Sequence, residues 1–263
     1  MFFPERINRY IKNSECQLNN VGMSDSKVYI FDEYVLKVQA ATPETNNEYE
    51  MVTWLAGRVP TPEILEYVID GGMAYTLMTK ANGQMLCDDA FMRNPEKVTD
   101  LVAESLKTLW SVDISDCPYT YSRLSERLKE ARANVENGEV DPDNAEPETF
   151  GSGGFFSPAE LLEWLENNRP EEDLVLTHGD FCLPNIFTDG ERVTAFIDNG
   201  KMGPADRWQD IAVVLRSLRH NFDGKYTNGI PYEGYDENML LRKLGIEPDE
   251  EKRRYYFLLD ELF

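Results

Sequence analysis

The order of strand-like and helix-like segments along the chain is the feature that most constrains its fold. Short runs rich in β-branched and aromatic residues, which are typical of strands, fall at 27–31, 34–38, 64–69 and 73–78. Between them, residues 43–57 have helical periodicity, and Thr45 and Glu48 have the spacing of a capping box. The first eighty residues therefore predict an antiparallel sheet accompanied by one helix.

Beyond about residue 83 the pattern becomes mostly helical. Apolar residues recur at helical intervals in 95–110, 121–137, 158–167, 204–220, 235–244 and 249–263. A short β-rich stretch, 174–187 and 193–200, interrupts these helices. The polar segment KANGQ at 80–84 separates the two compositions. We therefore expect an α+β fold of two lobes, with residues 1–80 in the first lobe and 81–263 in the second.

Composition excludes several classes of protein. At 263 residues, with 41% hydrophobic and 28% charged residues, the chain is long and apolar enough to bury a core. Four scattered cysteines without a CxxC pair, and only two histidines, disfavour a structural zinc site or a disulfide framework. No apolar run approaches the roughly 18 residues of a membrane span, so we expect a cytoplasmic protein that does not bind membranes.

The net charge of −22 makes the protein a poor partner for nucleic acid and a good one for a cationic ligand. The acid is concentrated in residues 136–173, which hold twelve Asp or Glu residues and one base, Arg169. This segment is either a solvated surface or a rim that attracts cations, and the sequence leaves both open. Within it, residues 138–156 form a loop that is too long to serve only as a connection.

The sequence HGDFCLPN, followed by FIDNG, contains the residues with the most specific spacing. Asp180 precedes Asn185 by five positions, and Asp198 arrives at the end of the next hairpin. Phosphoryl transfer needs a carboxylate that orients an acceptor hydroxyl and accepts its proton, and hard oxygen ligands that hold Mg²⁺. We therefore assign the first role to Asp180 and the second to Asn185 and Asp198. His178 is expected to hydrogen-bond to the loop backbone rather than act as a base.

Several motifs carry a resemblance to a known family. The segments HGDFCLPNIF, FIDNGKMGPADRWQDIA, GMSDSKVY, ISDCPY and YYFLLDELF are similar to those of the aminoglycoside 3′-phosphotransferases, which are antibiotic-resistance kinases of the protein-kinase-like fold. The similarity runs in order from near residue 20 to the last residue. It implies ATP as phosphate donor, Mg²⁺ as cofactor and a hydroxyl of an aminoglycoside as acceptor, in a monomer or weak dimer.

The resemblance also implies roles on the nucleotide side. Lys37 matches the strand lysine that binds the α- and β-phosphates, and Glu48 matches the helix glutamate that pairs with it. Ser24 belongs to a loop that closes over the phosphates, and the backbone at Thr79 and Ala81 would read the adenine edge. The chain has no Walker A pattern, which favours phosphate binding of the kinase type over the P-loop type.

On the acceptor side, the resemblance implies a site built from the catalytic aspartate and from residues near the C-terminus. Acidic groups there suit a polycationic acceptor. The matching positions are Asp180, Arg216, Asp260, Glu261 and Phe263, the last through its free carboxylate.

Departures from the family pattern leave the acceptor open. His220 and Asn221 stand where the family has two acidic residues, and Lys201 stands where it has arginine. A kinase of another small amino-alcohol or sugar is therefore an alternative. A non-catalytic nucleotide-binding pseudokinase is a second alternative, which the presence of all four polar site residues disfavours. A protein kinase is disfavoured because the chain lacks the D-F-G and A-P-E segments that bound an activation loop.

Overall fold

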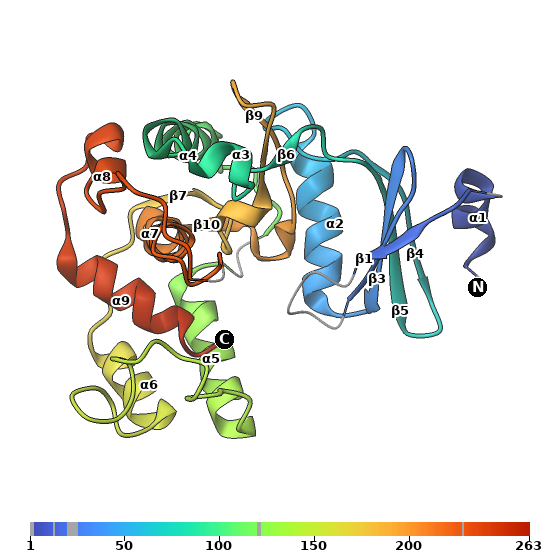
Figure 1. The fold of residues 1–263 in the computed structure, drawn as a ribbon. Helices are drawn as coiled ribbons and strands as arrows, with labels where there is room; N and C mark the ends of the chain where they lie inside the picture. The colour runs from blue at the N-terminus through green and yellow to red at the C-terminus, as the bar shows by residue number, and fades with distance from the viewer. Residues whose placement is uncertain (1–2, 13, 20–25, 120–121, 228) are drawn as a thin grey trace.

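The structure, a computed structural model, describes residues 3–12, 14–19, 26–119, 122–227 and 229–263, and it has two lobes (Figure 1). Ser24 lies outside the described residues. The smaller lobe contains an antiparallel sheet with the order β1-β2-β3-β5-β4. Its strands are Gln17–Asn19 (β1), Lys27–Ile30 (β2), Tyr34–Ala40 (β3), Ile64–Asp70 (β4) and Met73–Thr79 (β5). The predicted sheet is confirmed.

The two faces of this sheet have different partners. On one face Leu36 and Val38 of β3 join Leu77 in an apolar cluster, which the short helix α1 (Glu5–Ile11) covers. The sequence pattern did not predict α1. Because successive side chains of a strand point to opposite faces, Lys37 points away from this cluster, toward the rest of the molecule.

The predicted helix after β3 is present as α2 (Pro43–Leu55), but its predicted capping box was wrong. Thr42 is the N-cap: its hydroxyl accepts from the Thr45 N–H at 3.3 Å, and the Thr45 hydroxyl accepts from the Thr42 N–H at 3.0 Å. Pro43 follows at the first helical position, where its fixed φ suits a helix start. The helix therefore begins before Thr45, and the side chain of Glu48 is available for a different contact.

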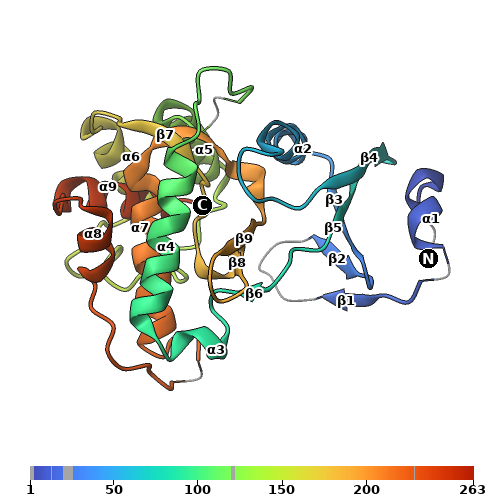
Figure 2. The same ribbon diagram turned by 90° about the horizontal axis from the view of Figure 1, so that it is seen from above.

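The larger lobe is mainly helical (Figure 2). Two predicted helices have the predicted bounds, and four others begin one to four residues later than predicted. The helices are Asp89–Met92 (α3), Pro95–Trp110 (α4), Leu124–Asn137 (α5), Pro158–Asn167 (α6), Arg207–Phe222 (α7), Met239–Leu244 (α8) and Glu250–Asp260 (α9). Nearly every residue of α7 is buried, so this helix is the axis of the lobe.

The β-rich stretch forms two small sheets inside this lobe. Leu174–Thr177 (β7) pairs antiparallel with Gly203–Asp206 (β10). Gln84–Met85 (β6), Ile186–Thr188 (β8) and Val193–Phe196 (β9) form the other sheet. Two 3₁₀ turns, Leu183–Asn185 (η1) and Asn199–Lys201 (η2), complete the stretch. The prediction of helix from residue 204 was wrong, because residues 204–206 pair with β7 before α7 begins.

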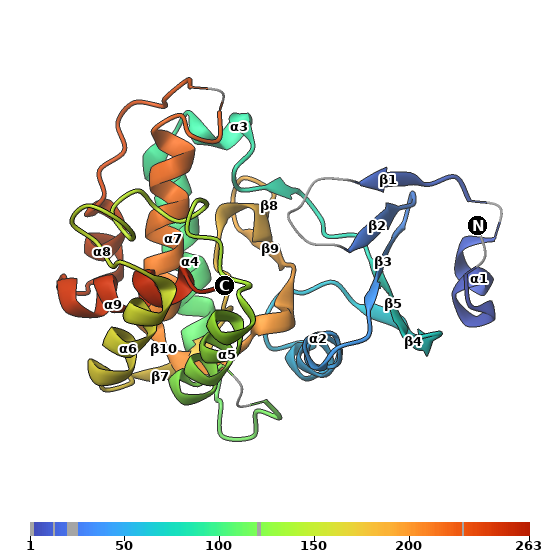
Figure 3. The same ribbon diagram turned by 90° about the horizontal axis from the view of Figure 1, so that it is seen from below.

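The lobes meet where α2 packs against η2 (Figure 3). The buried side chain of Asn47 donates from Nδ2 to the Gly200 carbonyl oxygen at 2.6 Å. This contact holds the helix of the small lobe next to the turn that follows Asp198. Among the described residues, no helix combines the length and the apolar character needed to cross a membrane.

A fully buried carboxylate organises the start of α7. Asp206 accepts from the backbone N–H of Trp208 at 2.8 Å and of Asp173 at 2.9 Å, and its Oδ2 lies 2.6 Å from Lys252 Nζ. It therefore caps α7, holds the approach to β7 and pairs with α9.

Replacing this carboxylate should destabilise the whole lobe. We expect Asp206→Ala to lower the free energy of unfolding by about 3–5 kcal/mol, because it leaves Lys252 and two N–H groups without their buried partner. Urea denaturation measures the change. Asp249→Ala is the control, because Asp249 caps α9 through a hydrogen bond alone. This substitution should lower the free energy of unfolding by about 1 kcal/mol. Equal losses in the two variants would contradict this account.

Candidate active site

Lys37 lies between two carboxylates, one from each lobe. Its Nζ is 3.1 Å from Glu48 Oε2 on α2 and 2.7 Å from Asp198 Oδ1, which follows β9. Burial acts to lower the pKa of the Lys37 ammonium, but the charges of Glu48 and Asp198 outweigh it and raise the pKa above its ordinary range. The side chain is therefore a fixed positive charge where the lobes meet, and the expected Lys37–Glu48 pair is present.

Asp198 is held in an unusual backbone conformation. Its φ of 61° and ψ of 53° are left-handed, and no other non-glycine among the described residues has a positive φ. Such a residue costs free energy and persists only where the surroundings enforce it. Burial acts to raise the pKa of Asp198, but the charge of Lys37 outweighs this and lowers the pKa. The group is therefore a carboxylate, and its side chain is 52% exposed, which leaves room for a further ligand.

Asp180 and Asn185 lie in a loop that closes on itself. Asn185 Nδ2 donates to the Asp180 backbone oxygen at 3.0 Å and to its Oδ2 at 3.1 Å. The turn η1 places Asn185 for these bonds, since the Asn185 N–H donates to the Cys182 oxygen at 3.1 Å. Because the amide nitrogen of Asn185 faces Asp180, its oxygen Oδ1 faces the other way.

His178 ties this loop to the strand that leads to Asp198. The ring is completely buried, and Nε2 lies 3.0 Å from the Ile197 oxygen, while Nδ1 accepts from the Asp180 N–H at 3.4 Å. An Nε2–H donor and an Nδ1 acceptor correspond to one neutral tautomer. The Ile197 N–H in turn donates to the backbone oxygen of Asn185 at 3.1 Å. The expected backbone role of His178 is confirmed, and the network brings the loop and Asp198 together.

Sequence reasoning missed Asp210, which holds the loop that leads to Asp180. It is fully buried in the first turn of α7, and its carboxylate accepts from the N–H groups of His178 at 2.8 Å and Gly179 at 2.9 Å. Burial raises the pKa of Asp210 to about 6. Gly179 has a φ of 84°, and a Cβ there would lie 2.3 Å from the Lys201 oxygen, so only glycine fits.

The acidic residues near the C-terminus have basic partners within the chain. Arg216 Nη1 donates to Glu261 Oε1 at 2.9 Å, and Arg216 Nη2 donates to Asp260 Oδ2. Arg127 Nη2 lies 3.9 Å from Asp260 Oδ1. Arg216, Asp260 and Glu261 therefore form one ion-paired cluster.

Phe263 links this cluster to the loop of Asp180. The guanidinium of Arg127 lies over the Phe263 ring, 3.9 Å from its centre, and Lys201 Nζ lies 5.7 Å from the same centre. Lys201 contacts Gly179, which precedes Asp180. A continuous series of contacts thus leads from Asp180 to the C-terminal residues.

The remaining predicted positions lie where the chain passes between the lobes. Thr79 is the last residue of β5, and its N–H donates to the Glu63 oxygen at 2.9 Å. Ala81 follows two residues later, before β6. Both are half-buried at this crossing.

The acidic segment 136–173 is mostly a solvated surface. All of it is described, and nine of its twelve acidic side chains belong to exposed residues. The other three are half-buried, and each pairs with a base from another part of the chain. These pairs are Glu146 with Arg219, Glu166 with Arg132 and Glu172 with Arg123.

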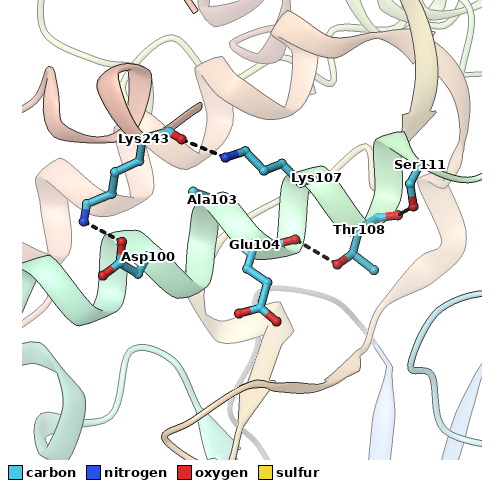
Figure 4. Close-up of a pocket in the computed structure, with 7 residues that line it drawn as sticks. All are labelled: Asp100, Ala103, Glu104, Lys107, Thr108, Ser111 and Lys243. Atoms are coloured by element: carbon cyan, nitrogen blue, oxygen red, sulfur yellow. Dashed lines mark hydrogen bonds and ion pairs between the residues drawn. The ribbon is translucent and has the colours of Figure 1, made fainter. Parts of the chain in front are cut away.

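A surface pocket of about 480 Å³ lies between α4 and α8, away from these residues (Figure 4). Bonds within the chain engage both of its lysines: Lys243 Nζ contacts Asp100, and Lys107 Nζ donates to the Lys243 backbone oxygen at 2.8 Å. No residue of the Lys37–Asp198 site lines it.

The oxygen donors of the site suit Mg²⁺ bound together with phosphates. No group of three His, Cys, Asp or Glu side chains in the described residues could hold a metal alone. Mg²⁺ is usually bound through one or two carboxylates plus substrate phosphates, and it keeps several waters. Asp198 Oδ2, which is not bonded to Lys37, and Asn185 Oδ1 are two oxygen atoms of the kind that such a Mg²⁺ site uses.

Comparison with known proteins agrees with this geometry. Residues 15–239 match the family described as the phosphotransferase enzyme family. Aminoglycoside 3′-phosphotransferases of Enterococcus faecalis and Staphylococcus aureus are each 38% identical, over 99% of this chain and 97% of theirs. The chain belongs to the aminoglycoside 3′-phosphotransferase family. It is a phosphotransferase, and the alternative of a non-catalytic protein is disfavoured.

Solved structures extend the likeness to the fold. The crystal structure of an aminoglycoside 3′-phosphotransferase of type VIII has a TM-score of 0.80 and 29% identity, with 94% of each chain covered. An aminoglycoside phosphotransferase of Streptomyces rimosus, solved with ADP and streptomycin, has a TM-score of 0.78 and 24% identity, over 98% of this chain and 96% of its own. The expected protein-kinase-like architecture of two lobes is confirmed.

The pKa of Asp210 predicts a pH-dependent contribution to the stability of this phosphotransferase. The pKa is about 6 in the folded protein and near its ordinary value of 3.8 in the unfolded chain. The stabilisation from protonation is therefore fully present below about pH 4, and it is lost as the pH rises through about 6. Between these values we expect the wild type to lose up to about 3 kcal/mol of unfolding free energy relative to Asp210→Asn, which does not titrate.

Urea denaturation of both proteins at about pH 4 and pH 7 tests this expectation. A difference between them that stays constant with pH would show that the carboxyl does not titrate in this range.

Proposed function

We propose that the chain transfers the γ-phosphate of ATP to a hydroxyl, the 3′-hydroxyl, of an aminoglycoside, and that it thereby confers antibiotic resistance. The observation that best supports this function is the 2.7 Å contact between Lys37 Nζ and Asp198 Oδ1. It joins the residue suited to phosphates with the residue suited to Mg²⁺, next to the hydrogen-bonded pair of Asp180 and Asn185.

On the donor side, residues 1–80 form the nucleotide-binding lobe of the proposal. Lys37, fixed by Glu48, binds the α- and β-phosphates. The backbone at Thr79 and Ala81 contacts the adenine edge, and Ser24 contributes to the loop over the phosphates. When bound, Mg²⁺ held by Asn185 and Asp198 supplies neutralisation of the phosphate charge.

On the acceptor side, residues 81–263 form the catalytic and acceptor-binding lobe. Asp180 orients the acceptor hydroxyl and accepts its proton, and the bond from Asn185 Nδ2 holds the carboxylate in place. Arg216, Asp260, Glu261 and Phe263 line the acceptor site, and the ion pairs from Arg216 hold the carboxylates of Asp260 and Glu261 in place. Catalysis then rests on positioning and charge neutralisation rather than on covalent chemistry.

The aminoglycoside class of acceptor rests on the names of the relatives and on the chain's negative charge. The same proposal includes a cytoplasmic location, a monomeric or weakly dimeric state and no nucleic-acid partner. A kinase of another small amino-alcohol or sugar remains the alternative, because of His220 and Asn221.

Removing the proposed base should abolish most of the turnover. With Mg·ATP and a panel of aminoglycosides and small amino-alcohols, we expect Asp180→Ala to lower kcat by about 10²- to 10⁴-fold, while KM for ATP changes little. A coupled assay of ADP release measures both. Asp189→Ala is the control, since Asp189 is an exposed carboxylate in the β8–β9 turn. Near-normal kcat in Asp180→Ala would remove Asp180 from this role, and turnover of small amino-alcohols alone would support the alternative.

The proposed metal ligand can be tested separately. Asp198→Asn replaces one charged oxygen by a neutral group, so we expect the Mg²⁺ concentration for half-maximal rate to rise by at least about tenfold. A titration of the rate with Mg²⁺ at fixed ATP measures it, with Asp189→Asn as the control. An unchanged Mg²⁺ requirement would exclude Asp198 from the metal site.

A further inference from the structure

Glu146, in the acidic segment, is surrounded by basic side chains from α7 and the residues after it. Its Oε1 lies 2.6 Å from His220 Nε2 and 2.9 Å from Lys225 Nζ, and its Oε2 lies 3.0 Å from Arg219 Nη2. Burial acts to raise the pKa of Glu146, but the bonds from Lys225 and His220 outweigh it and lower the pKa. Both oxygens of this carboxylate are therefore engaged by the chain itself.

This cluster is continuous with the proposed acceptor site. The Glu146 N–H donates to Glu261 Oε2 at 2.9 Å, and Glu261 Oε1 accepts from Arg216 at 2.9 Å. On the far side of the imidazole, His220 Nδ1 lies 3.3 Å from Asp223 Oδ2. One wall thus runs from the C-terminal residues along the second half of α7.

The wall is electrically balanced, although the whole chain has a net charge of −22. Counted by side chains alone, it contains four carboxylates and four groups that are positive at neutral pH, so these formal charges sum to zero when His220 is counted as neutral. The carboxylates are Glu146, Asp223, Asp260 and Glu261, and the positive groups are Arg127, Arg216, Arg219 and Lys225.

We infer that this wall determines acceptor specificity, and that His220 and Lys225 set it by occupying Glu146. The inference rests on the proposed function and names its substrate class more narrowly. An acceptor amine that approached Glu146 would have to displace Lys225 or His220 and would meet the like charge of Lys225 and Arg219. An acceptor hydroxyl carries no such charge. The enzyme therefore gains little from an amine at this wall and accepts aminoglycosides that carry hydroxyls there.

Two small aminoglycosides, neamine and paromamine, provide the test. They differ at one position, which carries an amine in neamine and a hydroxyl in paromamine, and the inference places this position against the wall. Isothermal titration calorimetry measures the binding of each, and the ADP-release assay measures turnover. For the wild type, we expect the two dissociation constants to agree within about threefold. A preference for neamine of about tenfold or more would overturn the inference, because that is the scale of one charge-assisted bond.

Lys225→Gln tests the residue that blocks Glu146, and its side chain is half exposed. We expect the ratio of affinities to shift toward neamine by about three- to tenfold, because one competing positive charge is gone. Lys129→Gln is the matched control: it removes the same charge from a 71% exposed side chain on α5. A ratio that does not change in Lys225→Gln, or that changes equally in both variants, would overturn the inference.

Glu146→Gln separates anchoring from direct binding. If Glu146 serves to hold the acidic segment on α7, both ligands lose affinity by a similar factor. A loss confined to neamine would show that Glu146 binds the amine itself and would overturn the inference. Because binding is measured independently of turnover, normal binding without phosphorylation refutes only the proposed function, and the affinity ratios still decide the inference. If neither ligand binds, both fail.

Discussion

The contact between Lys37 and Asp198 is the interaction on which the rest of the site depends. The alternation of side chains in β3 directs Lys37 away from the apolar cluster of the small lobe, and the left-handed backbone at Asp198 directs its carboxylate toward the amine. With Glu48, the three charges sum to −1. A site with this charge would repel a polyphosphate unless an additional cation were bound, in agreement with the proposed role of Asp198 as a ligand of Mg²⁺.

A single helix supports both halves of the chemistry. Two buried side chains of α7, Asp210 and Ser217, hold the loop of Asp180. The second half of the same helix supplies Arg216, Arg219 and His220 to the wall. Because α7 is one rigid element of 16 residues, roughly 24 Å long, it fixes the position of the Asp180 loop relative to these basic groups.

What the sequence predicted well was encoded locally. The bounds of α4 and α6 follow from Asn94 and Ser157, each an N-cap before a proline, and the loop from Asp180 to Asn185 is defined by its own spacing. What it missed depends on distant partners. Asp210 bonds to N–H groups some thirty residues earlier, and the strand at 203–206 exists because β7 pairs with it. Neither partner is visible in a local pattern, because helical periodicity continues smoothly across residue 206.

The charge of the chain acts at two different ranges. Most acids of residues 136–173 are exposed, and they contribute to a negative field that draws a polycation toward the protein and that salt would screen. At contact range the situation is reversed, because the acids nearest the proposed acceptor wall are paired within the chain. Attraction and discrimination are therefore separate properties here. The field brings in any cationic acceptor, and the neutral wall then distinguishes acceptors by where their hydroxyls and amines lie.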